Sequence, residues 1–225
     1  MNQLRQETIG LLGGTGKEGQ GLALRFAAAG FAVVIGSRET VKARESAAVL
    51  LDRLPGARIS GDENVATLAE ADLAFLCVPF DRAGELLDLC RPHWRQGCVA
   101  VDTTVPLRFE SGSVSLLELP EPSGSQHLVA RLPPGIPLVA AFKTISAHTL
   151  ADLETTLDCD LVVCGDLPAA RSRVMDAASA LASGLRVLDG GPLRHARALE
   201  AMCALAISLN RRYKAKSARY RIVGV

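Results

Sequence analysis

Six residues near the N-terminus have the glycine spacing of a phosphate-binding turn. The segment Gly14-Thr-Gly-Lys-Glu-Gly19 matches G-x-G-x-x-G and stands between a short apolar run and a helical pattern. Gly14 permits a tight turn, Gly16 lets the backbone approach a pyrophosphate, and Gly19 lets the helix pack against the strand. The first amides and the dipole of that helix favour a diphosphate. The spacing therefore predicts a dinucleotide site, against the alternative of a glycine-rich turn without a ligand.

The end of the second predicted strand favours NADP over NAD. This strand ends in Gly36-Ser-Arg38, where a site for NAD usually carries Asp or Glu. Arg38 offers a planar fork of donors that matches a phosphate dianion, Ser37 offers a hydroxyl, and Lys42 adds a mobile cation. We therefore expect these three side chains to hold the 2′-phosphate. Glu39 could instead pair with either cation, which would leave them as ordinary surface residues.

Strands and helices alternate along the chain. We expect strands at residues 8–12, 31–35, 58–60, 72–78, 98–102 and 137–142 and helices at 17–29, 42–54, 63–70 and 83–90. The proline-rich stretch 103–137 is expected to be loop-rich, although 114–119 and 125–131 could each form short structure. The rest repeats the alternation, with strands at 160–164 and 185–188 and helices at 168–183 and 193–213. Such alternation requires parallel pairing with right-handed crossovers. The prediction is an α/β fold: a doubly wound parallel Rossmann sheet over 1–145 and a small C-terminal α/β lobe over 146–225.

Composition narrows the class of partner. The 225 residues carry a formal net charge of +1, which provides no long-range field for nucleic acid or an anionic membrane. No apolar run is long enough to span a bilayer, and the polar N-terminus does not resemble a signal peptide. We therefore expect a cytoplasmic protein with a small-molecule partner.

Cysteines and histidines give no sign of a metal site. None of the six cysteines forms a CxxC pair, and no histidine stands at metal-ligand spacing from other ligands, so we expect reduced core thiols and no metal.

The last predicted helix carries more apolar residues than a small lobe needs. This excess predicts a homodimer formed through that helix.

Several segments together resemble one family. Gly13-Gly-Thr-Gly-x-x-Gly19, Gly36-Ser-Arg38 and Cys77-Val-Pro79 are similar to segments of the NADPH-dependent reductases of the deazaflavin coenzyme F420, and the similarity continues in 140–148, 163–166, 188–192 and 210–214. The resemblance implies an NADP-dependent oxidoreductase that transfers a hydride between NADP(H) and F420. Such a transfer needs two flat rings held face to face and no protein nucleophile.

The resemblance also implies roles for individual residues. It implies that Thr15, Gly16, Lys17 and Glu18 line the pyrophosphate, that Ser37, Arg38 and Lys42 hold the 2′-phosphate, and that Val78, Pro79 and Ala147 border the nicotinamide half. The deazaflavin is then expected beside the nicotinamide, between 142–146 and the C-terminal lobe, which would close the second-substrate site.

Lys143 is a departure from the family, whose members commonly have His at this position. A cation here could stabilise negative charge that develops on the acceptor ring, so we predict Lys143 as the catalytic residue. Alternatively, Lys143 could select a different acceptor, such as a flavin or an anionic small molecule, or it could simply reach solvent at the end of a strand.

Two further functions stay open at this stage. The chain could be an NADPH-dependent flavin or ferric reductase, or a non-enzymatic NADP-sensing module. A basic tail with six cations between Arg211 and Arg221 could attract the acidic side chain of the deazaflavin or the phosphates of NADP bound to a neighbouring subunit. It could equally be a solvated helix end, because cations are favoured there by the helix dipole.

Overall fold

Eight strands form one sheet in the computed structural model, which describes residues 7–225. The strands are β1 (Thr8–Leu12), β2 (Ala32–Ser37), β3 (Ile59–Glu63), β4 (Leu73–Leu76), β5 (Val99–Asp102), β8 (Leu138–Ala140), β9 (Cys159–Gly165) and β10 (Leu185–Asp189), in the spatial order β10-β9-β8-β5-β4-β1-β2-β3. The chain leaves β1 toward β2 and β3 and then returns to add β4 on the other side of β1. This reversal confirms the predicted Rossmann fold, and ligands of such sheets bind at the carboxyl ends of the strands where the order reverses.

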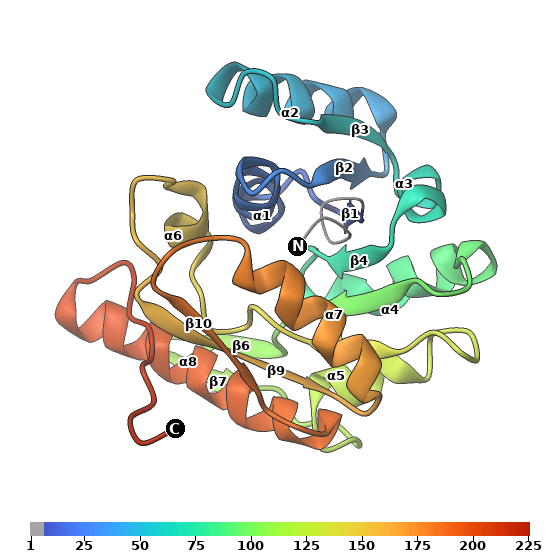
Figure 1. The fold of residues 1–225 in the computed structure, drawn as a ribbon. Coiled ribbons are helices and arrows are strands. Elements are labelled where there is room, and N and C mark those ends of the chain that lie inside the picture. The colour runs from blue at the N-terminus through green and yellow to red at the C-terminus, as the bar shows by residue number, and fades with distance from the viewer. Residues whose placement is uncertain (1–6) are drawn as a thin grey trace.

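Helices cover both faces of this sheet (Figure 1). The helices are α1 (Lys17–Ala28), α2 (Thr40–Arg53), α3 (Asn64–Glu70), α4 (Phe80–Cys90), α5 (Gly124–Val129), α6 (Ala147–Ala151), α7 (Pro168–Ser179) and α8 (Ala196–Tyr213), with 3₁₀ turns at Arg91–His93 and Leu193–His195. Figure 1 shows α1 and α6 on one side of the strands and α3, α4 and α5 on the other. Within residues 7–225, no helix combines the length and the apolar character that crossing a bilayer requires.

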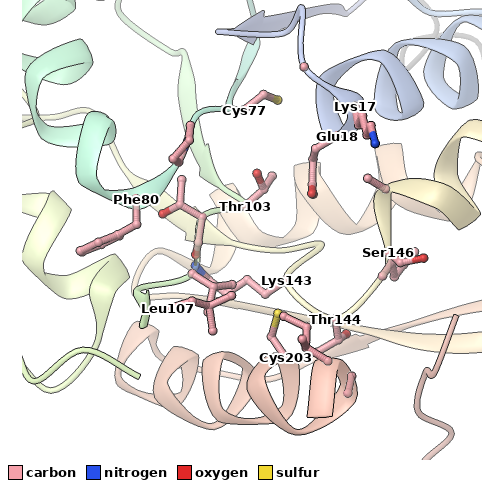
Figure 2. Close-up of a pocket in the computed structure, with 18 of the residues that line it drawn as sticks. Lys17, Glu18, Cys77, Phe80, Thr103, Leu107, Lys143, Thr144, Ser146 and Cys203 are labelled. Atoms are coloured by element: carbon pink, nitrogen blue, oxygen red, sulfur yellow. Dashed lines mark hydrogen bonds between the residues drawn. The ribbon is translucent and has the colours of Figure 1, made fainter. Parts of the chain in front are cut away.

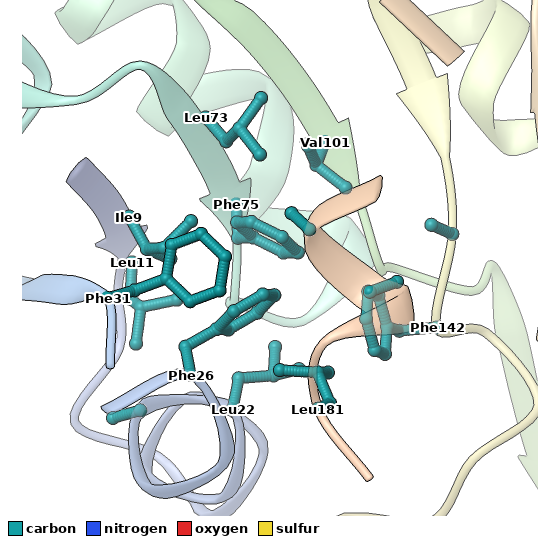
Figure 3. Close-up of a cluster of buried hydrophobic side chains, with 14 of the residues drawn as sticks. Ile9, Leu11, Leu22, Phe26, Phe31, Leu73, Phe75, Val101, Phe142 and Leu181 are labelled. Carbon is teal, nitrogen blue, oxygen red and sulfur yellow. The ribbon is translucent and has the colours of Figure 1, made fainter. Parts of the chain in front are cut away.

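Each face of the sheet has its own hydrophobic core. Strand residues that point to the α1 face pack with α1 and α7, and their neighbours pack with α3, α4 and α8 on the other face. Four phenylalanine rings meet at the centre of the first core (Figure 3), with centroids of Phe26 5.6 Å from Phe31, 5.1 Å from Phe75 and 6.1 Å from Phe142. Such tilted aromatic pairs add about 0.5–1.5 kcal/mol each beyond their buried area. The cluster therefore ties the first half of the sheet to the segment after β8.

The prediction of parallel pairing is wrong at one place. β8 and β9 are antiparallel, with Ala140 opposite Cys164, whereas the other pairs of this sheet are parallel. The reason is that the chain stays near the carboxyl end of β8 through α6, so β9 starts from the edge at which β8 stops. A parallel strand would have needed a crossover back to the opposite edge.

The proline-rich stretch 103–137 forms short elements near both segments for which the sequence allowed them, 114–119 and 125–131. It contains an antiparallel hairpin, β6 (Leu107–Glu110) and β7 (Ser113–Leu116), followed by α5. The hairpin packs along α8. Because β9 and β10 extend the same sheet, the two predicted segments 1–145 and 146–225 share it, and their division into two domains stays a prediction.

Candidate functional site

The glycine turn between β1 and α1 is built from close backbone contacts. The amide of Gly14 donates to the carbonyl oxygens of Leu11 (3.0 Å) and Gly36 (2.9 Å), which joins the ends of β1 and β2. A Cβ on Gly19 would lie 2.4 Å from the Cα atom of Gly14, so only glycine allows α1 to approach the turn this closely. A Cβ on Gly16 would meet nothing within 4 Å. The turn is therefore tight at its base and open where a ligand would approach.

Helix α1 begins without a side-chain cap. Gly16 is the N-cap residue, and no side chain accepts a hydrogen bond from the amides of the first turn. These amides and the positive end of the helix dipole together favour an anion. The local geometry therefore fits a diphosphate.

Asn64 supports the turn, and the sequence reasoning missed it. Its side chain is 3% exposed, and its Oδ1 accepts a hydrogen bond from the amide of Gly13 at 2.9 Å. Gln20 holds the other side of the turn by donating from Nε2 to the carbonyl of Thr15 and to Ser46 Oγ, both at 3.1 Å. No local pattern could have identified Asn64, because it contacts the turn from 51 residues away.

The predicted 2′-phosphate residues lie at the end of β2 and directly after it. Ser37 is buried, with its hydroxyl accepting from the amide of Glu39 at 3.3 Å, while Arg38 is exposed. Lys42 pairs with Glu39 at 2.6 Å, which is one of the alternatives drawn from the sequence. Both side chains of this pair are more than half exposed, so the pair contributes little to stability.

A cavity of about 520 Å³ opens beside the glycine turn. It is lined by 16–18 from the start of α1, 77–80 after β4, 103–105 after β5, 143–147 after β8, and Cys203, Ala206, Ile207 and Asn210 of α8. The cavity thus brings together Gly16, Lys17, Glu18, Val78, Pro79, Lys143 and Ala147 from the predicted set. Gly14, Thr15 and Gly19 belong to the turn behind it, and Ser37, Arg38 and Lys42 do not line it.

Figure 2 shows how side chains from separate elements converge on this cavity. Glu18 points into it from α1, Cys77 comes from the end of β4, and Cys203 faces it from α8. Burial raises the pKa of the Cys203 thiol to about 11, and the pKa of Cys77 is raised for the same reason, so both thiols are protonated at neutral pH. The wall of the cavity is mostly apolar, with a few charged groups.

Lys143 lies in the wall of this cavity and belongs to a buried polar network. Its Nζ is 2.7 Å from Asp102 Oδ2, donates to the carbonyl of Thr104, and is 3.9 Å from Glu200 Oε1. Asp102 also accepts from the hydroxyl of Ser125 at 2.6 Å. The Lys143 side chain is 0% exposed, so the alternative of a lysine that reaches solvent is wrong.

The backbone before Lys143 explains why this lysine turns inward. Phe142 has a φ of 61°, in the left-handed region that non-glycine residues seldom occupy. Its ring is 1% exposed and is anchored in the aromatic cluster. Packing of the ring thus stabilises a bend that no residue-type preference predicts.

Two carboxyl groups near Lys143 are shifted toward the protonated form. Burial raises the pKa of Glu18 to about 8, and Lys143 opposes that rise. Burial also raises the pKa of Glu200, again against the influence of Lys143. The Lys143 ammonium therefore faces the carboxyl groups of Glu18, Glu200 and Asp102.

The C-terminal tail closes one side of the cavity. Asn210 and Ala218 both line it, and Asn210 Oδ1 accepts from the amide of Ala218 at 2.9 Å. Arg221 pairs with Asp158 and Asp160, Arg219 donates to the carbonyl of Thr156, and Arg211 lies 5.6 Å from the ring centroid of Phe109. Arg212, Lys214 and Lys216 are exposed.

Comparison with known proteins adds an independent observation. The family model described as "NADP oxidoreductase coenzyme F420-dependent" matches residues 8–106. The chain is 34% identical over 222 residues to the F420-dependent NADP reductase of Methanocaldococcus jannaschii, covering 96% of this chain and 98% of the relative. It is 35% identical over 225 residues to the enzyme of the same name from Methanothermobacter marburgensis, with the same coverage.

A solved structure is similar in fold. It is that of a candidate F420-dependent NADP reductase from Arthrobacter sp. FB24, which is 22% identical, with a TM-score of 0.75 and coverage of 97% of this chain and 99% of that one. The whole chain, including the part after residue 145, therefore follows an architecture found in a solved protein.

Proposed function

Because this chain belongs to the F420-dependent NADP reductase family, we propose that it is an oxidoreductase that transfers a hydride between NADP(H) and the deazaflavin coenzyme F420. The observation that carries this proposal is the position of the glycine turn, which opens directly into a cavity large enough for flat rings. The two substrates supply the redox chemistry, and the protein supplies their position and a dry environment.

The NADP(H) site is proposed to follow the carboxyl edge of β1, β2 and β4. Gly14, Thr15, Gly16, Lys17, Glu18 and Gly19 would receive the diphosphate, Ser37, Arg38 and Lys42 the 2′-phosphate, and Val78, Pro79 and Ala147 the nicotinamide half. The open space at Gly16 and the uncapped start of α1 support this assignment. The deazaflavin would then occupy the rest of the cavity, toward 143–146 and α8.

Lys143 is proposed to act on the second substrate through its charge. Its ammonium lies in a low-dielectric wall, where a fixed charge influences the cavity without needing to touch the ring. Asp102 and Glu200 hold it in place and reduce its net effect. Lys143 would therefore both position the loop at 103–105 and favour negative charge on the acceptor.

The assay that tests the proposed function mixes the purified protein with NADPH and either F420 or FMN and follows the absorbance of each substrate. We expect oxidation of NADPH with F420. Turnover with FMN alone would identify a flavin reductase, and tight NADP binding without oxidation by either acceptor would identify an NADP-sensing module. Comparison of NADP with NAD in the same assay tests the assignment of Arg38.

We also propose a cytoplasmic homodimer that forms through α8. On this helix Leu205 is 52% exposed, and Tyr213 at its end is 71% exposed, which leaves apolar surface for a second copy. Sedimentation analysis of the wild-type protein and of a Leu205→Glu variant tests this, because the charge should dissociate the dimer. A monomeric wild-type protein would refute the assignment.

A further inference from the structure

We propose that Glu18 recognises NADP(H) as an uncharged carboxylic acid that donates a hydrogen bond to an oxygen of the cofactor, so that binding at alkaline pH takes up a proton. This inference rests on the proposed function, because it needs NADP(H) in the cavity. It makes Glu18 a residue that determines cofactor recognition by its protonation state.

The position of Glu18 places its carboxyl at the junction of the turn and the cavity. Glu18 is the second residue of α1 and lies within the first turn, whose amides would meet the diphosphate. Its side chain points into the cavity, whereas the neighbouring Lys17 is exposed (Figure 2). A group at this place is therefore close to any ligand that spans from the turn toward Val78 and Pro79.

The Glu18 carboxyl has no partner of its own in the described part of the chain. No hydrogen bond or ion pair joins it to another residue between 7 and 225. The cation that faces it, Lys143, is already bound to Asp102 at 2.7 Å and lies 3.9 Å from Glu200. An unpaired carboxyl in such a place is available to a ligand.

The charges around Glu18 disfavour its ionised form. Cys77 faces it from the segment after β4 and Cys203 from α8, and both thiols are uncharged at neutral pH. Lys143 contributes one positive charge, but it is already paired with Asp102 at 2.7 Å. A carboxylate at Glu18 would add negative charge without full compensation. Consistently, burial raises the pKa of Glu18 to about 8.

A bound diphosphate would strengthen this preference. In the free protein the dipole of α1 favours an anion near its first turn, which helps the carboxylate form of Glu18. The diphosphate would occupy those amides and bring further negative charge beside Glu18. Its pKa should therefore be higher with the cofactor bound than without it.

The pH dependence of NADP affinity follows from this coupling between NADP binding and protonation of Glu18. Below a pH of about 8 the Glu18 carboxyl of the free protein already carries its proton, so binding is independent of this group. Above that pH the proton must be taken up on binding, and affinity falls by as much as about tenfold per pH unit. The 2′-phosphate of NADP titrates at lower pH and does not contribute in this range.

The test is calorimetric titration with NADP from about pH 7 to about pH 9.5, in buffers that differ in ionisation enthalpy. We expect proton uptake by the wild-type protein to approach one proton for each NADP bound at the alkaline end. In Glu18→Gln, which keeps a neutral donor, uptake should vanish and affinity should be nearly independent of pH. Glu85→Gln, at a surface glutamate with 78% side-chain exposure, should behave as wild type.

A second variant separates hydrogen bonding from charge. Glu18→Leu should also be independent of pH but should bind NADP about threefold to tenfold more weakly than Glu18→Gln, as expected for one lost hydrogen bond. Equal affinities of these two variants would refute the hydrogen bond. The same pH slope in Glu18→Gln and wild type, or binding by the wild type without proton uptake, would overturn the proposal.

Titration of the ligand-free protein distinguishes this inference from the proposed function. With ¹³C-labelled glutamate, the carboxyl resonance that is missing in Glu18→Gln should titrate near pH 8 in the wild type. A midpoint at the ordinary value for glutamate would refute the uncharged state of Glu18 while leaving NADP binding intact. Failure of all variants to bind NADP at any pH would instead refute the proposed function, and this inference with it.

Discussion

Replacing Lys143 with methionine should expose how much of the site depends on one buried ammonium. The substitution keeps the length of the side chain and removes its charge. Asp102 and Glu200 would then be buried without a cation, although Ser125 and Thr104 still donate to Asp102, and the amides of 124 and 125 still donate to Glu200. Breaking a buried pair on one side costs about 3–5 kcal/mol, and the remaining donors favour the lower end, about 3 kcal/mol.

The loss of stability should depend on pH in a definite direction. Burial already raises the pKa of Glu200, and Lys143 opposes that rise. Because the variant lacks the ammonium, the pKa of Glu200 should be higher in it than in the wild type. A native-state pKa above the unfolded value means that, between these two pKa values, the native protein binds more protons than the unfolded protein does. Stability of the variant should therefore fall, relative to wild type, as pH rises from the ordinary pKa of glutamate through the raised one. Urea unfolding at several pH values measures this.

The double variant Asp102→Asn with Lys143→Met distinguishes a positioning role of Lys143 from a role in the reaction. The Asp102→Asn change removes the carboxylate that Lys143→Met leaves without its cation. The double variant should therefore recover about half or more of the stability that the single variant loses. If stability returns while turnover with F420 stays low and NADP affinity is normal, the charge of Lys143 acts on the reaction. If turnover returns with stability, Lys143 only positions the loop at 103–105. A single variant within about 1 kcal/mol of wild type would refute the reasoning, because the network would then not depend on the ammonium.

Three further variants test other parts of the site. Arg38→Ala should weaken NADP binding by about 1.5–3 kcal/mol and leave NAD binding unchanged, and equal losses for both would contradict its contact with the 2′-phosphate. Asn64→Ala leaves the amide of Gly13 without its acceptor, so NADP affinity should fall by about 1–2 kcal/mol in calorimetry, whereas an unchanged affinity would mean that the turn keeps its shape alone. Lys214→Ala with Lys216→Ala should reduce both the affinity for F420 and its salt dependence, and if the wild-type protein itself shows no salt dependence, the tail does not contact the acidic side chain.

The prediction of the first half of the site depends on local chemistry. The role of a G-x-G-x-x-G turn is set by residues within six positions, and the Ser37-Arg38 pair directly follows an apolar strand. Periodicity then predicts alternating strands and helices, whose chain connections leave few topologies open. For this reason the Rossmann order of the sheet agrees with the prediction.

Contacts between distant residues determined the rest. The support of Gly13 by Asn64, the union of Lys143 with Asp102 and Glu200, and the closure of the cavity by Ala218 each join residues that no local pattern relates. Pairing direction was also misjudged at β9, because only the path of the chain over α6 sets the edge from which that strand starts.

Glu18 is the clearest example of what the sequence predicts and what only the folded structure decides. From the sequence alone it is one variable position of a phosphate-binding turn, and its charge would be assigned as that of any glutamate. Its surroundings come from α1, β4, the segment after β8 and α8, and they are assembled only when the chain folds. Residue type and spacing thus predict where an anion binds, whereas the burial and the charges on which the protonation of Glu18 depends are brought together only by the tertiary structure.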